Sequence, residues 1–495
     1  MGFIFKVLFT LAFLQISFAY HFAIVGVCIS HMYSTSSFSK LLVSKGHKVT
    51  YVTSKECKGR YLESGAEIYS DKKWEVMNIK QLMDSHYITQ MYLASKFIQN
   101  ITDVSIQELD NWINNKSEKN KPDIILAPVS GIYIAMKAEK YGIPFVSFWA
   151  NGMPFPSIEN LKKSIFQIPK WIHEGSYVYD SIVQIQWTCI KLWMEFFFSF
   201  NKYNSMRGEV SLPQMENFFH LLRSYPTVTP FYEPIVPHGK VDDLYRISLT
   251  ANVHSAQLDD DVDRWLKKSD VPVLYIALGT STYMEEAVIE MFITAFEEQS
   301  EFRILWSLLK RDGVKVHETK DHILIKSFLP QIAILQRKET VGFLSHCGAA
   351  SIIETTSLEV PLILFPQGRD QNTIAEKANQ SGIGVYLQNP SSSDDIKKVL
   401  LEFQLRYKEL KQNIVNARKS IEENDEWDQF DAMIRNLIKK KTHSRLDKFD
   451  ELAYTFRKWT LILGTISVLV LVFCAYITTK CCKCICRRRR KIKKE

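Results

Sequence analysis

The chain has 495 residues, of which 46% are hydrophobic and 23% are charged. This length exceeds what one hydrophobic core normally organises, so two or three domains are expected. The formal net charge of +8 arises in the last sixteen residues, which hold nine Lys or Arg and one Glu. A nucleic-acid-binding surface should lie on a folded domain and include aromatic residues, so this distribution predicts no nucleic-acid partner.

The first predicted element is a secretory signal peptide at residues 1–19. Lys6 precedes an apolar run that ends at the small residue Ala19, which favours cleavage before Tyr20. The alternative is that this run forms a buried first strand. A chain that enters the lumen can be glycosylated at its Asn-X-Ser/Thr sequons, which begin at Asn100, Asn115 and Asn379.

Two strand–helix–strand patterns follow. The first has strands at residues 22–28 and 48–53 around a helix that stops at Gly46, and the second has strands at 123–127 and 144–148 around a helix at 133–141. Their repetition favours a parallel sheet with helices on both faces. We assign residues 20–245 to an N-terminal domain.

The aromatic-rich segment from about residue 154 to 233 interrupts this pattern. It forms either helices packed on the sheet or an apolar surface for an acceptor or a membrane. A second α/β series begins at residues 271–279 and has further strands at 303–306, 322–325, 340–344 and 362–365. The predicted fold class is therefore α/β, with two Rossmann-like domains that face each other across a cleft; the second comprises residues 246–445.

The C-terminal end predicts a single-pass type I membrane protein. After a return or juxtamembrane segment at 446–458, residues 459–479 carry no charge over 21 positions, enough to span a hydrocarbon core of about 30 Å. The positive-inside rule places the basic tail, residues 480–495, in the cytosol and the preceding domains in the lumen.

The tail itself allows several interpretations. Lys491 and Lys493 are typical of a dilysine retrieval signal, which predicts the endoplasmic reticulum membrane, although a plain stop-transfer cluster has the same charge. The cysteines between residues 481 and 486 favour palmitoylation over a zinc site, because no histidine completes a metal-binding set.

Polar residues with ligand-binding chemistry follow the strand at 340–344. His346 and Ser351 can donate hydrogen bonds to phosphate oxygens, and Gly348 lets backbone approach a ligand at the start of a helix. One turn further on, Glu354 can accept both hydroxyls of a ribose. Asp370 and Gln371 follow the next strand, where a carboxylate and an amide suit a sugar ring.

The spacing of these residues resembles the signature of the UDP-glycosyltransferase family. Residues 343–348, 351, 354, 361, 366 and 370–371 carry the resemblance, together with Leu329-Pro330-Gln331 and the loop at 278–281. The resemblance implies a GT-B fold, a UDP-sugar as co-substrate, no other cofactor and no metal. It also implies donor-binding roles for Thr280, Phe328, Gln331, His346, Gly348, Ser351, Glu354, Asp370 and Gln371.

By the same resemblance, the N-terminal domain binds the acceptor, and His31 after the first strand is the catalytic base. An imidazole suits removal of the acceptor proton while the acceptor oxygen attacks the anomeric carbon, and a single displacement inverts the configuration. A metal is the alternative, because residues 259–263 contain an Asp-x-Asp pattern. The position of this pattern before Arg264 indicates instead the acidic first turn of a solvated helix.

The sequence departs from the family pattern at several positions. Pro128 stands where an aspartate normally orients the histidine, and Asp123 is too far back along the strand to replace it. Arg337 stands where a histidine is common, and it could still serve a phosphate. The remaining departures are Phe328 for tryptophan, Ala350 and Ile374 for asparagine, and Glu359 for glycine.

Two functions follow from these residues. The first is an inverting glycosyltransferase that moves glucuronic acid or glucose from its UDP donor to a small lipophilic acceptor in the lumen. The second is a catalytically impaired relative that binds a UDP-sugar or a lipid, as Pro128 would suggest. Homo-oligomerisation is compatible with either function.

Overall fold

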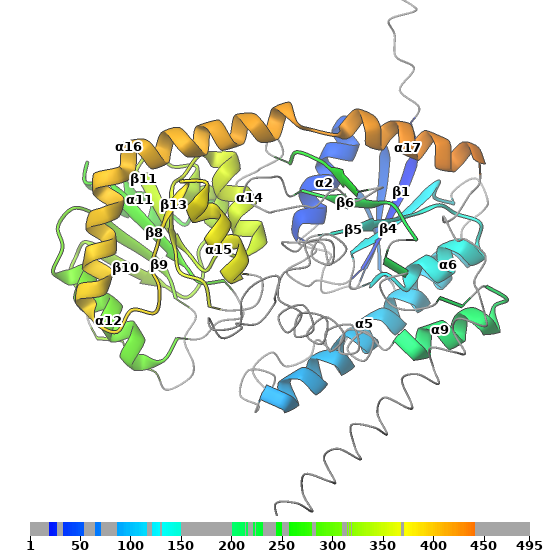
Figure 1. Ribbon diagram of the computed structural model, residues 1–495, viewed down its shortest axis with the longest axis horizontal. Coiled ribbons are helices and arrows are strands. Elements are labelled where there is room, and N and C mark those ends of the chain that lie inside the picture. The colour runs from blue at the N-terminus through cyan, green and yellow to red at the C-terminus, as the bar shows by residue number, and fades with distance from the viewer. Residues whose placement is uncertain are drawn as a thin grey trace, which may run out of the picture.

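Two parallel β-sheets, each covered by helices on both faces, form the body of the protein (Figure 1). The computed structural model describes residues 19–26, 33–53, 65–70, 87–115, 121–128, 131–149, 200–212, 214–215, 221–222, 224–230, 244–249, 257–279, 284–308, 314, 316–317, 319–367 and 371–440.

The N-terminal domain holds a seven-stranded sheet of order β3-β2-β1-β4-β5-β6-β7. All its strand pairs are parallel. The strands are β1 (His21–Val25), β2 (Lys48–Val52), β3 (Glu67–Tyr69), β4 (Ile124–Pro128), β5 (Phe145–Phe148), β6 (Thr227–Thr229) and β7 (Leu244–Arg246). The strand order reverses between β1 and β4, the position at which open parallel sheets bind ligands.

Alternation along the strands builds one core on each face of this sheet. Ala23 and Val25 of β1 belong to a cluster with α5 (Tyr87–Asn114), α6 (Ile134–Lys140) and α9 (Phe200–Glu209). Phe22 and Ile24 point the other way, into a cluster with α2 (Tyr33–Ser44). Both faces of β1 are therefore apolar, as is typical of a strand inside a parallel sheet.

The C-terminal domain repeats this plan with a six-stranded sheet of order β10-β9-β8-β11-β12-β13. Its strands are β8 (Val273–Ala277), β9 (Arg303–Ser307), β10 (Ile323–Lys326), β11 (Thr340–Ser345), β12 (Leu362–Leu364) and β13 (Gly384–Tyr386). Its helices are α11 (Asp260–Leu266), α12 (Glu286–Glu297), α13 (Gln331–Leu335), α14 (Ala349–Leu358), α15 (Gln371–Gln380) and α16 (Ser393–Glu423). The order reverses between β8 and β11, which places the second switch point beside His346.

The last described helix, α17 (Trp427–Lys440), returns to the N-terminal domain (Figure 1). Phe430 and Ile434 belong to the same cluster as Phe22 and Ile24 of β1. At the start of α17, Glu426 accepts hydrogen bonds from the backbone N–H of Arg246 at 2.7 Å and from its guanidinium at 3.0 Å. Helix α17 is therefore part of the N-terminal domain.

Most strand positions in the sequence analysis agree with the structure to within two or three residues. The boundary at residue 245 falls inside β7, so the first sheet continues to Arg246. Helix α17, within the segment assigned to the second domain, returns to the N-terminal domain, and the predicted return segment at 446–458 lies outside the described residues. None of the helices that the structure describes is long and apolar enough to cross a membrane. The predicted signal peptide and membrane span lie outside the described residues, apart from Ala19.

Glu359 caps the C-terminal end of α14 in a left-handed conformation, with φ of 58°. This conformation explains why glycine suits the position. Two contacts of Glu359 partly offset the free-energy cost of this backbone conformation. Its carboxylate pairs with Arg418 at 3.2 Å, and its carbonyl accepts a hydrogen bond from Lys411 at 2.6 Å. Both partners come from α16, so Glu359 links the two helices.

The backbone cost at this position can be measured by comparing two variants. Glu359→Gly and Glu359→Ala lose the same ion pairs, but only alanine keeps a Cβ in the left-handed region. We expect the glycine variant to have a free energy of unfolding about 1 kcal/mol higher than the alanine variant. Chemical denaturation checks this, and equal stability of the two variants would contradict the expected strain.

Candidate active site

The predicted donor-binding residues gather at the carboxyl edge of the C-terminal sheet. Strand β11 ends at Ser345, His346 follows directly, and Gly348 is the N-cap of α14. Gly279 lies just beyond β8, the neighbour of β11 in the sheet, with φ of 78°. The two glycines therefore flank the histidine from adjacent strands.

The imidazole of His346 fits closely between these glycines. A Cβ atom added at Gly348 would lie 2.5 Å from His346 Nε2, and one added at Gly279 would lie 2.7 Å from the same atom. Both distances are shorter than real Cβ contacts, so a side chain at either position would displace the ring. The absence of side chains at these two positions is what allows the ring to occupy its position.

Burial also sets the charge state of His346. Desolvation lowers its pKa to about 4, so the imidazole is neutral near pH 7 and keeps one N–H to donate. Its Nδ1 atom is buried and has no hydrogen-bond partner among the described residues. The other ring nitrogen, Nε2, lies between Gly279 and Gly348, and a neutral imidazole beside this helix N-terminus is suited to an anionic oxygen.

Ser351 and Glu354 lie one turn apart on α14, and Gln331 at the start of α13 connects them. The amide Nε2 of Gln331 donates to Ser351 Oγ at 3.2 Å and also to a carboxylate oxygen of Glu354. The structure thus brings together three residues that are 23 positions apart at most in the sequence. They form one polar surface beside His346.

Glu354 is the strongly perturbed acid of this group. Desolvation by burial raises the pKa of its carboxyl group to about 7, while the hydrogen bond from Gln331 acts in the opposite direction. A carboxyl group with this pKa is half ionised near neutral pH. Only the ionised form can accept hydrogen bonds from two hydroxyls with both oxygens.

The binding of UDP should therefore strengthen as the pH rises through 7. Because ribose hydroxyls favour the ionised form of Glu354, the affinity at pH 8 should be about tenfold higher than at pH 6, where about one-tenth of the carboxyl groups are ionised. Titration calorimetry across this pH range measures the effect. Glu354→Gln should remove the pH dependence, and an unchanged slope in that variant would assign it to another group.

Phe328 lies before α13, and 74% of its surface is exposed. A large exposed aromatic ring beside a polar binding surface is suited to stacking with a planar ligand group.

Gln371 is the first residue of α15, and its side-chain oxygen accepts a hydrogen bond from the backbone N–H of Gln367 at 2.9 Å. Three predicted site residues, namely His31, Thr280 and Asp370, lie outside the described residues.

The N-terminal switch point carries no carboxylate at Pro128. This residue ends β4, pairs with Phe148 of β5 and is buried. Asp123 lies at the other edge of the sheet, where its carboxylate accepts a hydrogen bond from the backbone N–H of His21 at 2.8 Å. Asp123 therefore cannot act beside Pro128, as the strand geometry predicts.

Two further groups of charged residues have partners outside this site: Arg337, and the aspartates of residues 259–263, which form the predicted acidic first turn of a helix. Arg337 precedes β11 at the amino edge of the sheet and pairs with Asp263 at 3.2 Å and Glu339 at 3.3 Å. It lies at the edge of the sheet opposite His346, so the phosphate role considered for it is wrong. Asp261 and Asp263 lie in the first turn of α11 and pair with Lys326 and Lys267 respectively.

Two further departures from the family pattern, Ala350 and Ile374, lie in helices of the C-terminal domain. Ala350 lies in the first turn of α14, and Ile374 is buried in the core of the C-terminal domain. The sequence analysis included Cys347 in the family signature, but it did not predict that this residue is buried with φ of 63° between His346 and Gly348. Its left-handed backbone turns the chain into α14, and a cysteine gives no sequence signal for that conformation.

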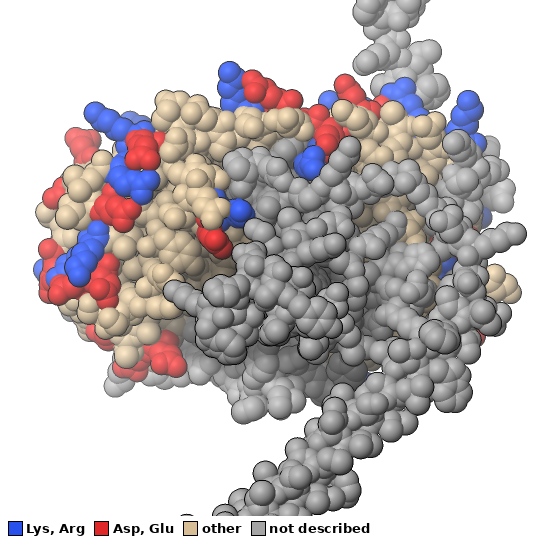
Figure 2. All heavy atoms as spheres, in the orientation of Figure 1, with Lys and Arg blue, Asp and Glu red and all other residues tan. Residues whose placement is uncertain are grey.

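The sequon asparagines Asn100, Asn115 and Asn379 are all exposed, so each is accessible to a modifying enzyme. Acidic and basic side chains are interspersed along α16 (Figure 2), where pairs such as Arg406 with Glu402 form at 2.9 Å, whereas the charged residues of α12 are all acidic. Within the described ranges, no group of three His, Cys, Asp or Glu side chains is arranged to hold a metal ion.

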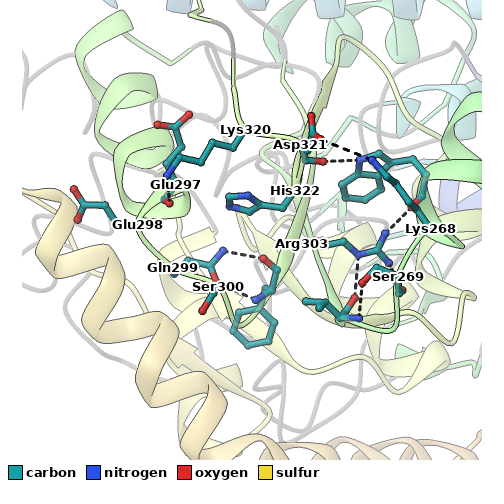
Figure 3. Close-up of a pocket in the computed structure, with 13 residues that line it drawn as sticks. Lys268, Ser269, Glu297, Glu298, Gln299, Ser300, Arg303, Lys320, Asp321 and His322 are labelled. Atoms are coloured by element: carbon teal, nitrogen blue, oxygen red, sulfur yellow. Dashed lines mark hydrogen bonds and ion pairs between the residues drawn. The ribbon is translucent and has the colours of Figure 1, made fainter.

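A separate pocket lies at the amino edge of the C-terminal sheet (Figure 3). Arg303 at its base donates to the carbonyl oxygens of Val271, Trp265, Leu266 and Ser269. His322 contacts the carbonyl of Phe296, and Lys320 donates to that of Glu297. These contacts hold the helix ends in place, at the edge opposite His346.

The fold and this site define a two-domain sugar-nucleotide-binding protein of the GT-B type. The family model for UDP-glucoronosyl and UDP-glucosyl transferase matches residues 23–495. The chain therefore belongs to the UDP-glycosyltransferase family.

Individual relatives support this assignment over most of the chain. The NDP-glycosyltransferase YjiC of Bacillus subtilis is 20% identical over 423 residues, which cover 85% of this chain and 98% of YjiC. The UDP-glycosyltransferase 73C4 of Arabidopsis thaliana is 22% identical and covers 69% of this chain and 76% of its own length.

Solved structures share the fold at lower identity. Medicago truncatula UGT71G1, complexed with UDP-glucose, superposes with a TM-score of 0.60 at 14% identity and covers 86% of this chain and 99% of its own. Phytolacca americana UGT2, complexed with UDP-2fluoro-glucose and pterostilbene, gives a TM-score of 0.59 at 17% identity, with 85% and 100% covered.

Proposed function

We propose that this protein transfers glucuronic acid or glucose from a UDP-sugar to a small lipophilic acceptor with inversion at the anomeric carbon. The observation that carries the proposal is the surface formed by His346, Ser351, Glu354 and Gln331 at the carboxyl edge of the second sheet. Family membership supports the same reaction.

Each part of the donor has a group of matching chemistry in this surface. The neutral imidazole of His346 and the N-terminal N–H groups of α14 would hold the diphosphate. Glu354 would accept the ribose hydroxyls, and the exposed ring of Phe328 would stack with the base. Gln371, with Asp370 beside it, would contact the transferred sugar. Thr280 would contact the phosphate.

The chemical step would use His31 as the base. Its imidazole would take the proton of the acceptor hydroxyl while the oxygen attacks the anomeric carbon, and UDP would leave. The two relatives crystallised with UDP-glucose and UDP-2fluoro-glucose support a UDP-sugar donor, and pterostilbene in the second supports an aromatic acceptor. The reaction would require no further cofactor.

The predicted targeting segments place this reaction in the lumen of the endoplasmic reticulum. A signal peptide at residues 1–19, a span at 459–479 and a basic tail would give a type I membrane protein. Expression of the tagged full chain with glycosidase treatment tests this location. A shift in mass that requires Asn100, Asn115 and Asn379 supports it, and a chain without glycans contradicts it.

The transfer reaction can be tested directly on the full chain in detergent. Labelled UDP-glucose and UDP-glucuronic acid are each incubated with a panel of phenols and sterols, and the glycosylated products are separated. We expect products with at least one donor, and none for His31→Ala. Retained UDP binding without any product would contradict the proposed enzyme.

A catalytically impaired binding protein is the second candidate. The observation that favours it is Pro128 at the carboxyl end of β4, because the side chain of proline cannot orient an imidazole. In that case the donor surface would still bind UDP-sugar, and an acceptor would not be converted. The two candidates therefore differ in turnover and not in UDP affinity.

A further inference from the structure

Ile353 of α14 connects the two domains. Its side chain packs against the core cluster of the C-terminal domain and also against the N-terminal cluster that contains Phe38 and Leu42 of α2. No other described residue packs against core clusters of both domains. Ile353 is only partly buried, so this contact lies at the periphery of both hydrophobic cores.

The position of Ile353 within α14 gives this contact a consequence for the donor. The residue lies between Ser351 and Glu354, which share a face of the helix and both contact Gln331. Successive helical residues are about 100° apart, so Ile353 points away from that face. One short segment of α14 therefore binds the donor on one side and the N-terminal domain on another.

The N-terminal side of this contact is firmly packed. The ring of Phe38 lies 5.5 Å from that of Phe148 in β5 and 5.9 Å from that of Phe430 in α17. The sheet, α2 and the return helix therefore form one apolar body. In Figure 1, α14 lies on the side of its domain that faces α2.

We propose that Ile353 is a positioning residue that sets the distance between the donor and the N-terminal domain. This inference rests on the proposed transferase function. The acceptor oxygen must approach the anomeric carbon to about 3–3.5 Å, and a misplacement of about 1 Å can cost about 100-fold in rate. Because α14 holds the donor, the apolar contact at Ile353 fixes where the donor lies relative to the acceptor.

Substitution of Ile353 should separate transfer from donor binding. Ile353→Ala is expected to lower kcat for transfer between tenfold and about 100-fold. The Kd for UDP should stay within about threefold, because the donor surface lies within the C-terminal domain. Ile353→Val, which keeps the branched Cβ, should restore most of the transfer rate.

Leu358→Ala is the matched control. Leu358 is also a partly buried residue of α14, but it packs against the C-terminal cluster alone. This variant should lose stability without a selective loss of transfer. An Ile353→Ala protein that transfers sugar as fast as the wild type would overturn the proposal, and so would parallel losses of UDP binding and transfer.

Failure of the proposed function has a different signature. A wild-type protein that binds UDP but converts no acceptor would contradict the proposed transferase. The contact of Ile353 with the N-terminal domain would then be tested by hydrogen exchange. UDP should then slow amide exchange in α2 of the wild-type protein and not in Ile353→Ala. Identical exchange of α2 with and without UDP in the wild type would overturn the positioning role.

Discussion

Replacing Pro128 by Asp is expected to raise the turnover of glycosyl transfer between 100-fold and about 10⁴-fold. A carboxylate at the end of β4, beside β1, could orient the imidazole of His31 and stabilise its protonated form. General acid–base catalysis contributes about 10²- to 10⁴-fold in rate, and loss of an orienting carboxylate in a serine-protease triad costs about 10⁴-fold. Initial rates with a phenol and with an alkyl alcohol would measure the change.

Pro128→Asn tests whether the charge of the new side chain is responsible. Asparagine has nearly the same shape as aspartate, so this variant should show a much smaller increase in turnover. His31→Ala should abolish the gain when combined with Pro128→Asp. Thermal melts of all variants would show whether the buried site tolerates the change. An Asp variant that is folded and binds UDP, yet no faster than wild type, would show that this position does not limit turnover.

Gly348→Ala should weaken UDP binding between tenfold and about 100-fold. The added methyl group would lie 2.5 Å from His346 Nε2, so the ring must move from the position that it holds beside α14. A hydrogen bond to a charged group contributes about 1.5–3 kcal/mol, which corresponds to this loss of affinity. Titration calorimetry with UDP at pH 8 would give the dissociation constant.

Gly279→Ala should produce a similar loss, since its methyl group would meet the same ring from the other side. Gly142→Ala is the control for backbone strain, because Gly142 has φ of 67° and open space around it in the N-terminal domain. That variant should lose stability without a change in UDP affinity. Unchanged affinity in Gly348→Ala would exclude His346 as the group that holds the diphosphate.

Periodicity and turn residues predicted the strands of both sheets well where the apolar runs were long. Strand β8 and its neighbours β9 and β11 were found because each is a continuous apolar run buried on both faces. The short strands β3, β6, β7 and β13 were missed. Each has three residues, and sheet pairing with a neighbour defines them more than their own composition does.

The grouping of the candidate donor-binding residues could be predicted because they lie in one stretch with fixed spacing. His346, Ser351 and Glu354 are ordered by a single strand–helix turn, so local geometry brings them together. The role of Arg337 could not be predicted in this way. Its guanidinium reaches Asp263 across the sheet edge, a contact between residues 74 positions apart.

By itself, the sequence determined the parallel α/β class, the two-domain organisation and the polar residues that gather at the carboxyl edge of the second sheet, because these follow from short-range periodicity and local spacing. Only the tertiary structure decided the charge states and the contacts between distant segments. Burial shifts the pKa values of His346 and Glu354, and packing places Ile353 against a second core. Desolvation and packing both depend on which distant residues exclude water, and the chain must fold before that is defined.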